Sequence, residues 1–325
     1  MPLLQVDQLN LTLRTARGRV PALRDVGFAL ERGGTLGLVG ESGSGKSLTA
    51  LALLGLLPEG AEVSGRILLD GQNLLDLDEP GWCRLRGNRI AMTFQEPMTA
   101  LNPVQTIGQQ VMEPLLLHRR LTRASAADEA VRLLDRVGIP EPRRRLAAYP
   151  HQMSGGQRQR VMIAMALSCD PALLVADEPT TALDATVQRA ILALLKELVA
   201  ERGMAMLLIS HDLNSIAETC RDIAVMYGGR VVEQGPADSV FDRPAHPYTR
   251  GLLAALPSLE AEPAAVRPRL ATIPGSVPDL ADFGAGCTFA DRCGFAVAAC
   301  RAMAPPDVVL AAGHLAACIR LEEIQ

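Results

Sequence analysis

Aromatic side chains are scarce in this sequence, because phenylalanine, tryptophan and tyrosine together make up only 3% of its 325 residues. Positive charge is not in excess either: 36 acidic residues outnumber 32 lysines and arginines, which leaves a net charge of −4. Nucleic-acid binding draws on basic surfaces for the phosphate backbone and on aromatic rings for base stacking. We therefore expect no nucleic-acid partner.

Long apolar runs are also missing. The longest one, LTALALLGLLP from Leu48, is too short to span a bilayer and follows a glycine-rich loop, so we interpret it as a buried helix. The N-terminal residues MPLLQVDQLNLTL lack the basic start and continuous apolar core of a signal peptide. We expect a cytoplasmic chain that reaches the membrane only through a partner.

Buried-strand runs alternate with helical patterns and predict an α/β fold. The runs TLGLVG, ALLVADEP and AMLLISHD are buried-strand candidates, and an amphipathic helix that ends at Gly203 separates the last two. Strand, helix and strand in this order are typical of a parallel sheet. The runs LLQVDQLNLTLR, VGFAL and GRILLDG make the first third β-rich and predict a β-rich flank.

The texture of the sequence changes twice along the chain. From about residue 96 to 152 the pattern is helical, and ADEAVRLLDRVG stops at Gly138. From Arg243 on, nine of the 22 prolines fall in the last 83 residues. We expect a core domain at 1–242 with a helical insertion at about 96–152, and a separate loop-rich tail at 243–325.

Residues 40 to 47, GESGSGKS, fit the phosphate-binding pattern G-x-x-x-x-G-K-[ST]. Such a loop wraps phosphates with its backbone, its lysine reaches the β- and γ-phosphates, and its hydroxyl holds Mg²⁺. Because a strand precedes it and a helix follows it, we predict an ATP-type nucleotide site. The predicted phosphate-binding residues are Gly40, Glu41, Ser42, Gly43, Ser44, Gly45, Lys46 and Ser47.

Three further segments predict the catalytic groups. Asp177 and Glu178 end a buried strand, which suits Asp177 to the metal and Glu178 to polarising the attacking water; a helix cap is the structural alternative. His211 ends another strand and is a candidate γ-phosphate sensor, or else a capping or core histidine. Gln95 follows a strand-like run, and its amide suits the orientation of water or Mg²⁺.

A second glycine loop, MSGGQ, lies at the end of the helical insertion and has no lysine. A glycine-rich helix start points N–H groups at an anion. This loop cannot easily fold back onto the phosphate-binding loop of its own chain, residues 40–47, which we call the phosphate loop. We therefore predict that it binds the nucleotide of a partner chain across a head-to-tail dimer. The residues involved are Ser154, Gly155, Gly156 and Gln157.

Taken together, these motifs resemble the ABC-type ATPases in order and spacing, with the Ala182-Leu183-Asp184 turn as a further match, over residues 1 to about 240. FQEPMTALNP, YPHQMSGGQRQRVMIAMAL, HPYTRGLLAALPSLE and IPGSVPDL resemble the ATP-binding subunits of dipeptide and oligopeptide importers. The resemblance implies an ATP-hydrolysing motor, peripheral on the cytoplasmic face of the inner membrane. Its partners would be transmembrane permease subunits, a second identical or related ATPase subunit and, indirectly, an extracytoplasmic substrate-binding protein.

Some features leave alternatives open. The same motor would serve nickel or glutathione import, and a soluble ABC ATPase outside transport or a redox-sensing module are rival functions. The aromatic residue that usually stacks on adenine is absent from LTLRTARGRV, which leaves Leu13, Arg14 or Arg17 for that contact. The basic clusters at 118–120 and 143–145 lie where a permease would dock, but a solvated face is the preferred interpretation.

Four of the seven cysteines crowd into the tail, separated by five, six and seventeen residues. No Cys-x-x-Cys pair is present, so spacing alone leaves a [4Fe–4S] cluster, a structural Zn²⁺ and unligated thiols open. The importer resemblance favours the iron–sulfur cluster. The predicted ligands are Cys287, Cys293, Cys300 and Cys318, whereas Cys83, Cys169 and Cys220 are expected to be ordinary buried thiols.

Overall fold

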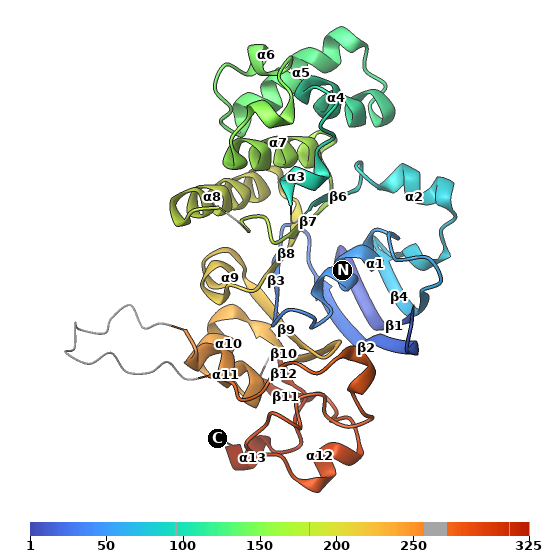
Figure 1. Cartoon of the computed structure of the whole chain (residues 1–325), viewed down its shortest axis with the longest axis vertical. Helices are drawn as coiled ribbons and strands as arrows, with labels where there is room; N and C mark the ends of the chain where they lie inside the picture. Colours follow the sequence, from blue (N-terminus) through green and yellow to red (C-terminus); the bar gives the residue numbers. More distant parts are fainter. Residues whose placement is uncertain (95, 182, 257–271, 312, 325) are drawn as a thin grey trace, which may run out of the picture.

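An eight-stranded, mostly parallel sheet forms the centre of the fold (Figure 1). The structure, a computed structural model, describes residues 1–94, 96–181, 183–256, 272–311 and 313–324. From one edge to the other, the strands are β11 (Val308–Ala311), β12 (His314–Ala316), β10 (Arg230–Pro236), β9 (Asp222–Tyr227), β3 (Thr35–Val39), β8 (Ala205–Ser210), β7 (Leu173–Asp177) and β6 (Ile90–Thr93). The five strands from β9 to β6 are parallel, which confirms the predicted α/β class.

A second, antiparallel sheet covers one face of the central strands. It contains β2 (Gly18–Leu30), β1 (Leu4–Thr15), β4 (Glu62–Leu69) and β5 (Gln72–Asn73), in that order. Leu36 and Leu38 of β3 pack with this sheet in one apolar cluster, whereas Leu174 of β7 and Leu208 of β8 belong to a second cluster with the helices. The central strands are therefore apolar on both faces, as expected for a parallel sheet covered on each side.

Helices pack against the other face of the central sheet and extend beyond it. The helices are α1 (Lys46–Leu53), α2 (Glu79–Leu85), α3 (Pro97–Ala100), α4 (Ile107–His118), α5 (Arg123–Arg136), α6 (Pro142–Arg145), α7 (Gly155–Leu167), α8 (Ala185–Arg202), α9 (Leu213–Thr219), α10 (Ala237–Asp242), α11 (Pro247–Ala254), α12 (Ala298–Ala302) and α13 (Leu321–Ile324). Three short 3₁₀ turns lie at Leu74–Asp76, Pro150–Gln152 and Leu280–Asp282. Figure 1 shows α4 to α7 gathered at one end of the molecule.

The helix ends follow from local sequence signals. α5 begins after Thr122, whose side chain caps the Ser125 N–H, and Gly138 follows its end with a φ of 75°. α8 begins after Asp184, which accepts hydrogen bonds from Thr186 and Val187, and ends at the left-handed Gly203. The predicted stops at Gly138 and Gly203 are confirmed.

The C-terminal residues extend the central sheet. β12 pairs with β10 through Glu233 and Gln234, and β11 adds a further antiparallel strand. The buried Glu233 carboxylate accepts hydrogen bonds from the N–H groups of Ala245 and His246, at 2.8 and 2.9 Å, and lies 2.8 Å from Nε2 of His314. One carboxylate thus joins β10 to the start of α11 and to β12.

Replacing Glu233 by alanine should destabilise the attachment of the C-terminal residues. The change leaves buried N–H groups without an acceptor, and we expect the free energy of unfolding to fall by about 3 kcal/mol. Urea denaturation of Glu233→Ala and of Gln234→Ala, the next residue along β10, measures the difference. Equal losses in the two variants would contradict the assigned role of the carboxylate.

Candidate functional site

The loop of residues 40–47 connects β3 to α1 and depends on its glycines. Gly43 and Gly45 have φ angles of 80° and 104°, in the left-handed region that favours glycine. At Gly40, a Cβ atom would lie 2.2 Å from the carbonyl oxygen of Met226. The core therefore presses closely against this loop, and a side chain at Gly40 would displace it.

Lys46 begins α1 and is buried inside the loop. Its Nζ donates to the carbonyl oxygens of Gly40 and Glu41, at 2.8 and 2.9 Å. Burial lowers the pKa of Lys46, and the carboxylates of Glu178, Asp177 and Glu41 oppose that shift. Its ammonium group is held by carbonyls and can turn to an anion that enters the loop.

Ser47 and Asp177 face each other across the site. The Ser47 hydroxyl lies 3.4 Å from Oδ1 of Asp177, the last residue of β7. Burial raises the pKa of Asp177, the adjacent Glu178 raises it further, and the hydrogen bond from Ser47 lowers it. A hydroxyl and a carboxylate close together beside a phosphate-binding loop are the protein ligands expected for Mg²⁺ bound with a nucleotide.

Glu178 follows in a constrained conformation. Its φ is 44°, in the left-handed region, and its N–H donates to the carbonyl oxygen of Ile209 at 2.9 Å. Its carboxylate accepts from the Thr181 hydroxyl at 2.8 Å and lies 3.2 Å from Nδ1 of His211. Burial raises the pKa of Glu178, but the hydrogen bonds from Thr181 and His211 outweigh this and lower it. The carboxylate is kept in its basic, ionised form.

His211 lies one residue beyond β8, and its side chain is 64% exposed. The carboxyl ends of β3, β7 and β8 thus bring the phosphate loop, the acidic pair and this histidine to one edge of the sheet. Gln95 lies outside the described residues, as does Ala182 of the predicted turn. β6, which precedes Gln95, ends at Thr93 beside β7.

The second glycine loop starts α7. The Ser154 hydroxyl accepts from the Gln157 N–H at 3.3 Å, and the Gln157 side chain accepts from the Ser154 N–H at 3.1 Å. Ser154 and Gly155 are exposed. Within the described part of the chain, no hydrogen bond or ion pair joins residues 154–157 to the phosphate loop. Figure 1 shows α7 at the border of the helical end, apart from α1.

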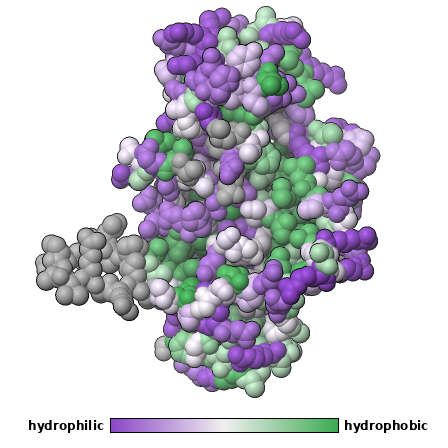
Figure 2. All heavy atoms as spheres, in the orientation of Figure 1, coloured by the Kyte–Doolittle hydropathy of each residue, from purple (hydrophilic) through white to green (hydrophobic). Residues whose placement is uncertain are grey.

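The basic clusters of the helical end take part in surface ion pairs. Arg119 lies 2.9 Å from Asp170, and Arg143 lies 3.0 Å from Asp128. Figure 2 shows mainly hydrophilic side chains over α5 and α6, whereas hydrophobic ones gather on the middle of the same face. These pairs agree with a solvated face.

An apolar groove separates the core from the helical end. Leu54 and Leu56, which follow α1, line it together with Phe94, Met162 and Met165. Phe94 and Leu56 are 43% and 39% exposed. The groove takes its walls from both parts of the molecule.

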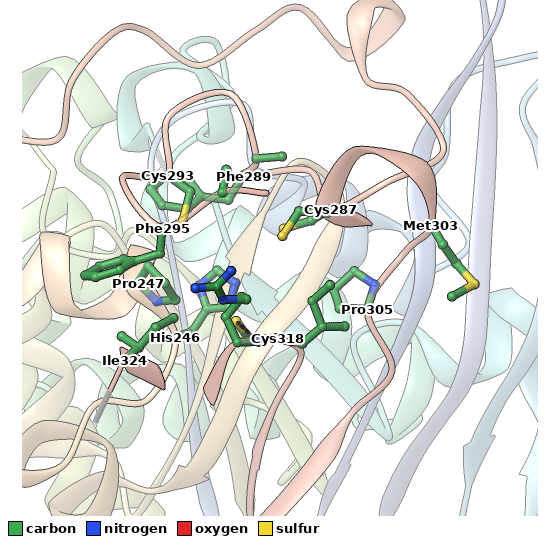
Figure 3. Close-up of a pocket in the computed structure, with 15 residues that line it drawn as sticks. His246, Pro247, Cys287, Phe289, Cys293, Phe295, Met303, Pro305, Cys318 and Ile324 are labelled. Carbon is green, nitrogen blue, oxygen red and sulfur yellow. Dashed lines mark hydrogen bonds between the residues drawn. The ribbon is translucent and has the colours of Figure 1, made fainter. Parts of the chain in front are cut away.

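The four C-terminal cysteines, widely spaced in sequence, line one pocket, with Cys287, Cys293 and Cys318 labelled in Figure 3. Burial raises the pKa of the Cys287 thiol to about 11, and it also raises those of Cys293 and Cys318. The Cys318 sulfur accepts a hydrogen bond from the Arg320 N–H at 3.4 Å. The backbone of Phe289 and that of Phe295 partly offset the raised pKa values of Cys287 and Cys293.

Among the described residues, no histidine, cysteine, aspartate or glutamate side chains form a group of three that could hold a metal ion. None of the seven cysteines, all of which are described, forms a disulfide bond. The expectation that Cys83 is buried is wrong: Cys83 is exposed on α2, whereas Cys169 and Cys220 are buried. Trp82, the neighbouring residue, takes the buried side of this short helix instead.

The residues considered for adenine lie on β1 and in the turn that follows it. Arg17 lies 3.5 Å from Asp279 and 3.4 Å from Asp282, so the C-terminal residues reach this end of the antiparallel sheet. Arg14 lies 4.0 Å from Glu62 on β4, and Leu13 is half-buried. The sequence pattern gave no sign of these contacts with the C-terminal residues.

Family comparisons match two parts of the chain. The ABC transporter family matches residues 23–181, and the C-terminal region of oligopeptide/dipeptide transporters matches residues 232–300. The oligopeptide transport ATP-binding protein OppD of Salmonella typhimurium is 49% identical over 323 residues, which cover 99% of this chain and 95% of the relative. OppD of Escherichia coli K12 is also 49% identical and covers 99% of this chain and 94% of its own length.

A solved structure has the same core. It is a dimeric ATP-binding cassette, MJ0796, in a post-hydrolysis state bound to ADP and Pi. The match has a TM-score of 0.65 at 28% identity and covers 72% of this chain and 98% of that one. In the described part of the present chain, no helix is long and apolar enough to cross a bilayer.

Proposed function

Since this chain belongs to the ABC transporter family of ATP-binding proteins and carries the C-terminal region of its oligopeptide and dipeptide transporters, we propose that it is the ATP-hydrolysing motor of a peptide importer. The observation that carries the proposal is the meeting of Lys46, Asp177 and Glu178 at one edge of the sheet. A phosphate site and a carboxylate base are the parts that nucleotide hydrolysis needs. The peptide substrate rests on relatives named for oligopeptide transport.

The partners follow from the same relationship. We propose transmembrane permease subunits, a second ATPase subunit that is identical or related, and a substrate-binding protein on the outer side. The chain then works as a peripheral protein on the cytoplasmic face of the inner membrane. We propose that the apolar groove between the core and the helical end binds a helix of the permease. Such a helix would contact Leu56 on one wall and Met165 on the other, so a shift of the helical end relative to the core would move it.

In the proposed reaction, the phosphate loop binds ATP and Lys46 turns from the loop carbonyls to the β- and γ-phosphates. Ser47, Asp177 and Gln95 would bind Mg²⁺, which would neutralise phosphate charge. Glu178 orients the attacking water as general base, for which its lowered pKa keeps it ionised near neutral pH. His211, 3.2 Å from this carboxylate, would sense the γ-phosphate.

We propose that the second glycine loop completes the site of a partner chain. Gly155 and Gly156 stand at an exposed helix N-terminus, where N–H groups and the helix dipole favour an anion. The dimeric relative bound to ADP and Pi supports a dimer of this kind. ATP binding would then close the pair and hydrolysis would reopen it, with the helical end passing the motion to the permease.

We also propose a [4Fe–4S] cluster held by Cys287, Cys293, Cys300 and Cys318, which would draw these side chains closer together than they lie here, where no three potential ligands among the described residues are grouped to hold a metal. Two observations support it: the four side chains line one pocket, and the Arg320 N–H donates a hydrogen bond to the Cys318 sulfur. Hydrogen bonds to sulfur are typical of iron–sulfur sites. A cluster would link well-separated parts of a proline-rich segment, so its role would be structural first.

Glu178→Gln should remove the general base and leave phosphate binding intact. ATP turnover should fall by about 10²-fold or more, and an ATP-bound dimer should accumulate. In membrane vesicles with the permease, uptake of a labelled peptide should stop as well. Near-normal turnover would remove Glu178 from its assigned role, and uptake of nickel or glutathione in place of peptide would select one of the alternative substrates.

Ser154→Arg should block dimer closure but leave ATP binding to the isolated chain almost unchanged, because Ser154 is assigned to the partner's nucleotide. Mixing this variant with Lys46→Ala should rebuild one composite site per dimer and restore part of the turnover. If the Ser154→Arg monomer itself fails to bind ATP, the loop acts within its own chain.

Protein purified without oxygen should be brown and contain about four irons per chain. Cys293→Ser should lower the iron content, whereas Cys83→Ser, on an exposed helix, is the matched control and should not. One zinc per colourless chain would favour the zinc alternative. Protein without any metal would overturn the cluster.

A further inference from the structure

An ion pair joins the C-terminal residues to the phosphate loop. Arg292 donates from both terminal nitrogens to the Glu41 carboxylate, with Nη1 to Oε2 at 2.6 Å and Nη2 to Oε1 at 3.2 Å. The Arg292 side chain is 6% exposed and that of Glu41 is 30% exposed. The two residues are 251 positions apart in the sequence, and Glu41 is the second residue of the phosphate loop.

Arg292 is fixed from several directions. Its Nε donates to the carbonyl oxygen of Pro274 at 2.8 Å, and its Nη1 lies 3.3 Å from the Tyr227 hydroxyl. The guanidinium also lies over the Tyr227 ring, 5.7 Å from the centroid. Arginine does not lose its proton in proteins, so this buried cation needs a lasting anionic partner. Glu41 provides it.

Glu41 is equally constrained. Its N–H donates to the hydroxyl of Tyr248 at 2.8 Å, and its carbonyl oxygen accepts from Lys46. Tyr248 belongs to α11 and is fully buried against Tyr227, with ring centroids 4.6 Å apart. The amide, carbonyl and carboxylate of Glu41 are each bound, two of them by residues that follow Arg243.

A carboxylate within a phosphate loop is an electrostatic problem, because the loop binds a polyanion. Like charges repel strongly where burial limits the screening by water. The pairing with Arg292 offsets the charge of Glu41 and holds its side chain toward the C-terminal residues. Without Arg292, the carboxylate would be free to face the phosphates.

We propose that Arg292 is a positioning residue for ATP binding: it neutralises Glu41 and so makes the affinity of the phosphate loop for a triphosphate depend on the C-terminal segment. The proposal rests on ATP binding at this loop. Because the effect is electrostatic, it is larger for ATP than for ADP, which carries one negative charge less. A purely structural role would weaken both nucleotides alike.

The test is nucleotide binding by the full-length chain in a Glu178→Gln background, measured by calorimetry with ATP and with ADP. Arg292→Ala should weaken ATP binding roughly tenfold and ADP binding less, as expected for an uncompensated nearby charge. Adding Glu41→Gln should restore most of the loss, because it removes the carboxylate. Arg292→Lys keeps the positive charge but loses the bidentate contact, so its ATP affinity should lie between those of Arg292→Ala and of the double variant.

Arg301→Ala is the matched control, since this exposed arginine pairs with Asp291 at 3.3 Å and should leave both affinities unchanged. Lys46→Ala tests the premise: if it binds ATP as tightly as its parent, the nucleotide site itself is wrongly assigned. Equal weakening for ATP and ADP, or a double variant no better than Arg292→Ala, would overturn the proposed role of Arg292. Unchanged ATP affinity in both Arg292 variants would do the same.

Discussion

The parallel alignment of β3, β8 and β7 is the constraint on which the site depends. Their register pairs Val39 with Ser210 and Asp177 with Ile209, so the three strands end at the same edge. The phosphate loop, the acidic pair and His211 each follow one of these ends. Backbone hydrogen bonds continue the alignment beyond the strands, since the Glu178 N–H still donates to the carbonyl oxygen of Ile209. Glu178 has a positive φ in this position. The fold therefore brings three local motifs into one site without long loops.

This alignment also explains why so much was predictable from the sequence. Each motif is a short apolar run followed by a polar or glycine-rich turn, and parallel strands place such turns together, so the positions of Lys46, Asp177 and His211 followed from local pattern alone. The α/β class and the stops at Gly138 and Gly203 followed from periodicity and glycine. The family relationship agrees with the importer resemblance of the motifs.

The contacts of the C-terminal residues were not predictable in this way. Arg292 and Glu41 are separated by most of the chain, and neither has a local pattern that points to the other. β11 is mostly exposed, so it lacks the alternation that marks a strand with one buried face. Cys83 is exposed, although free cysteines are usually buried, because it lies on the outer side of a short helix whose buried side carries Trp82.

The extension of the central sheet by β12 has a consequence for dissecting the protein. β10 pairs with β9 on one side and with β12 on the other, and the Ala317 N–H adds a bond to Val232. A chain cut after Arg243 would expose the outer edge of β10, with a row of unpaired N–H and C=O groups beside a buried apolar core. Such edges recruit strands from other molecules. Truncation to the nucleotide-binding part would therefore leave β10 as an exposed edge strand that is prone to pair with strands of other molecules.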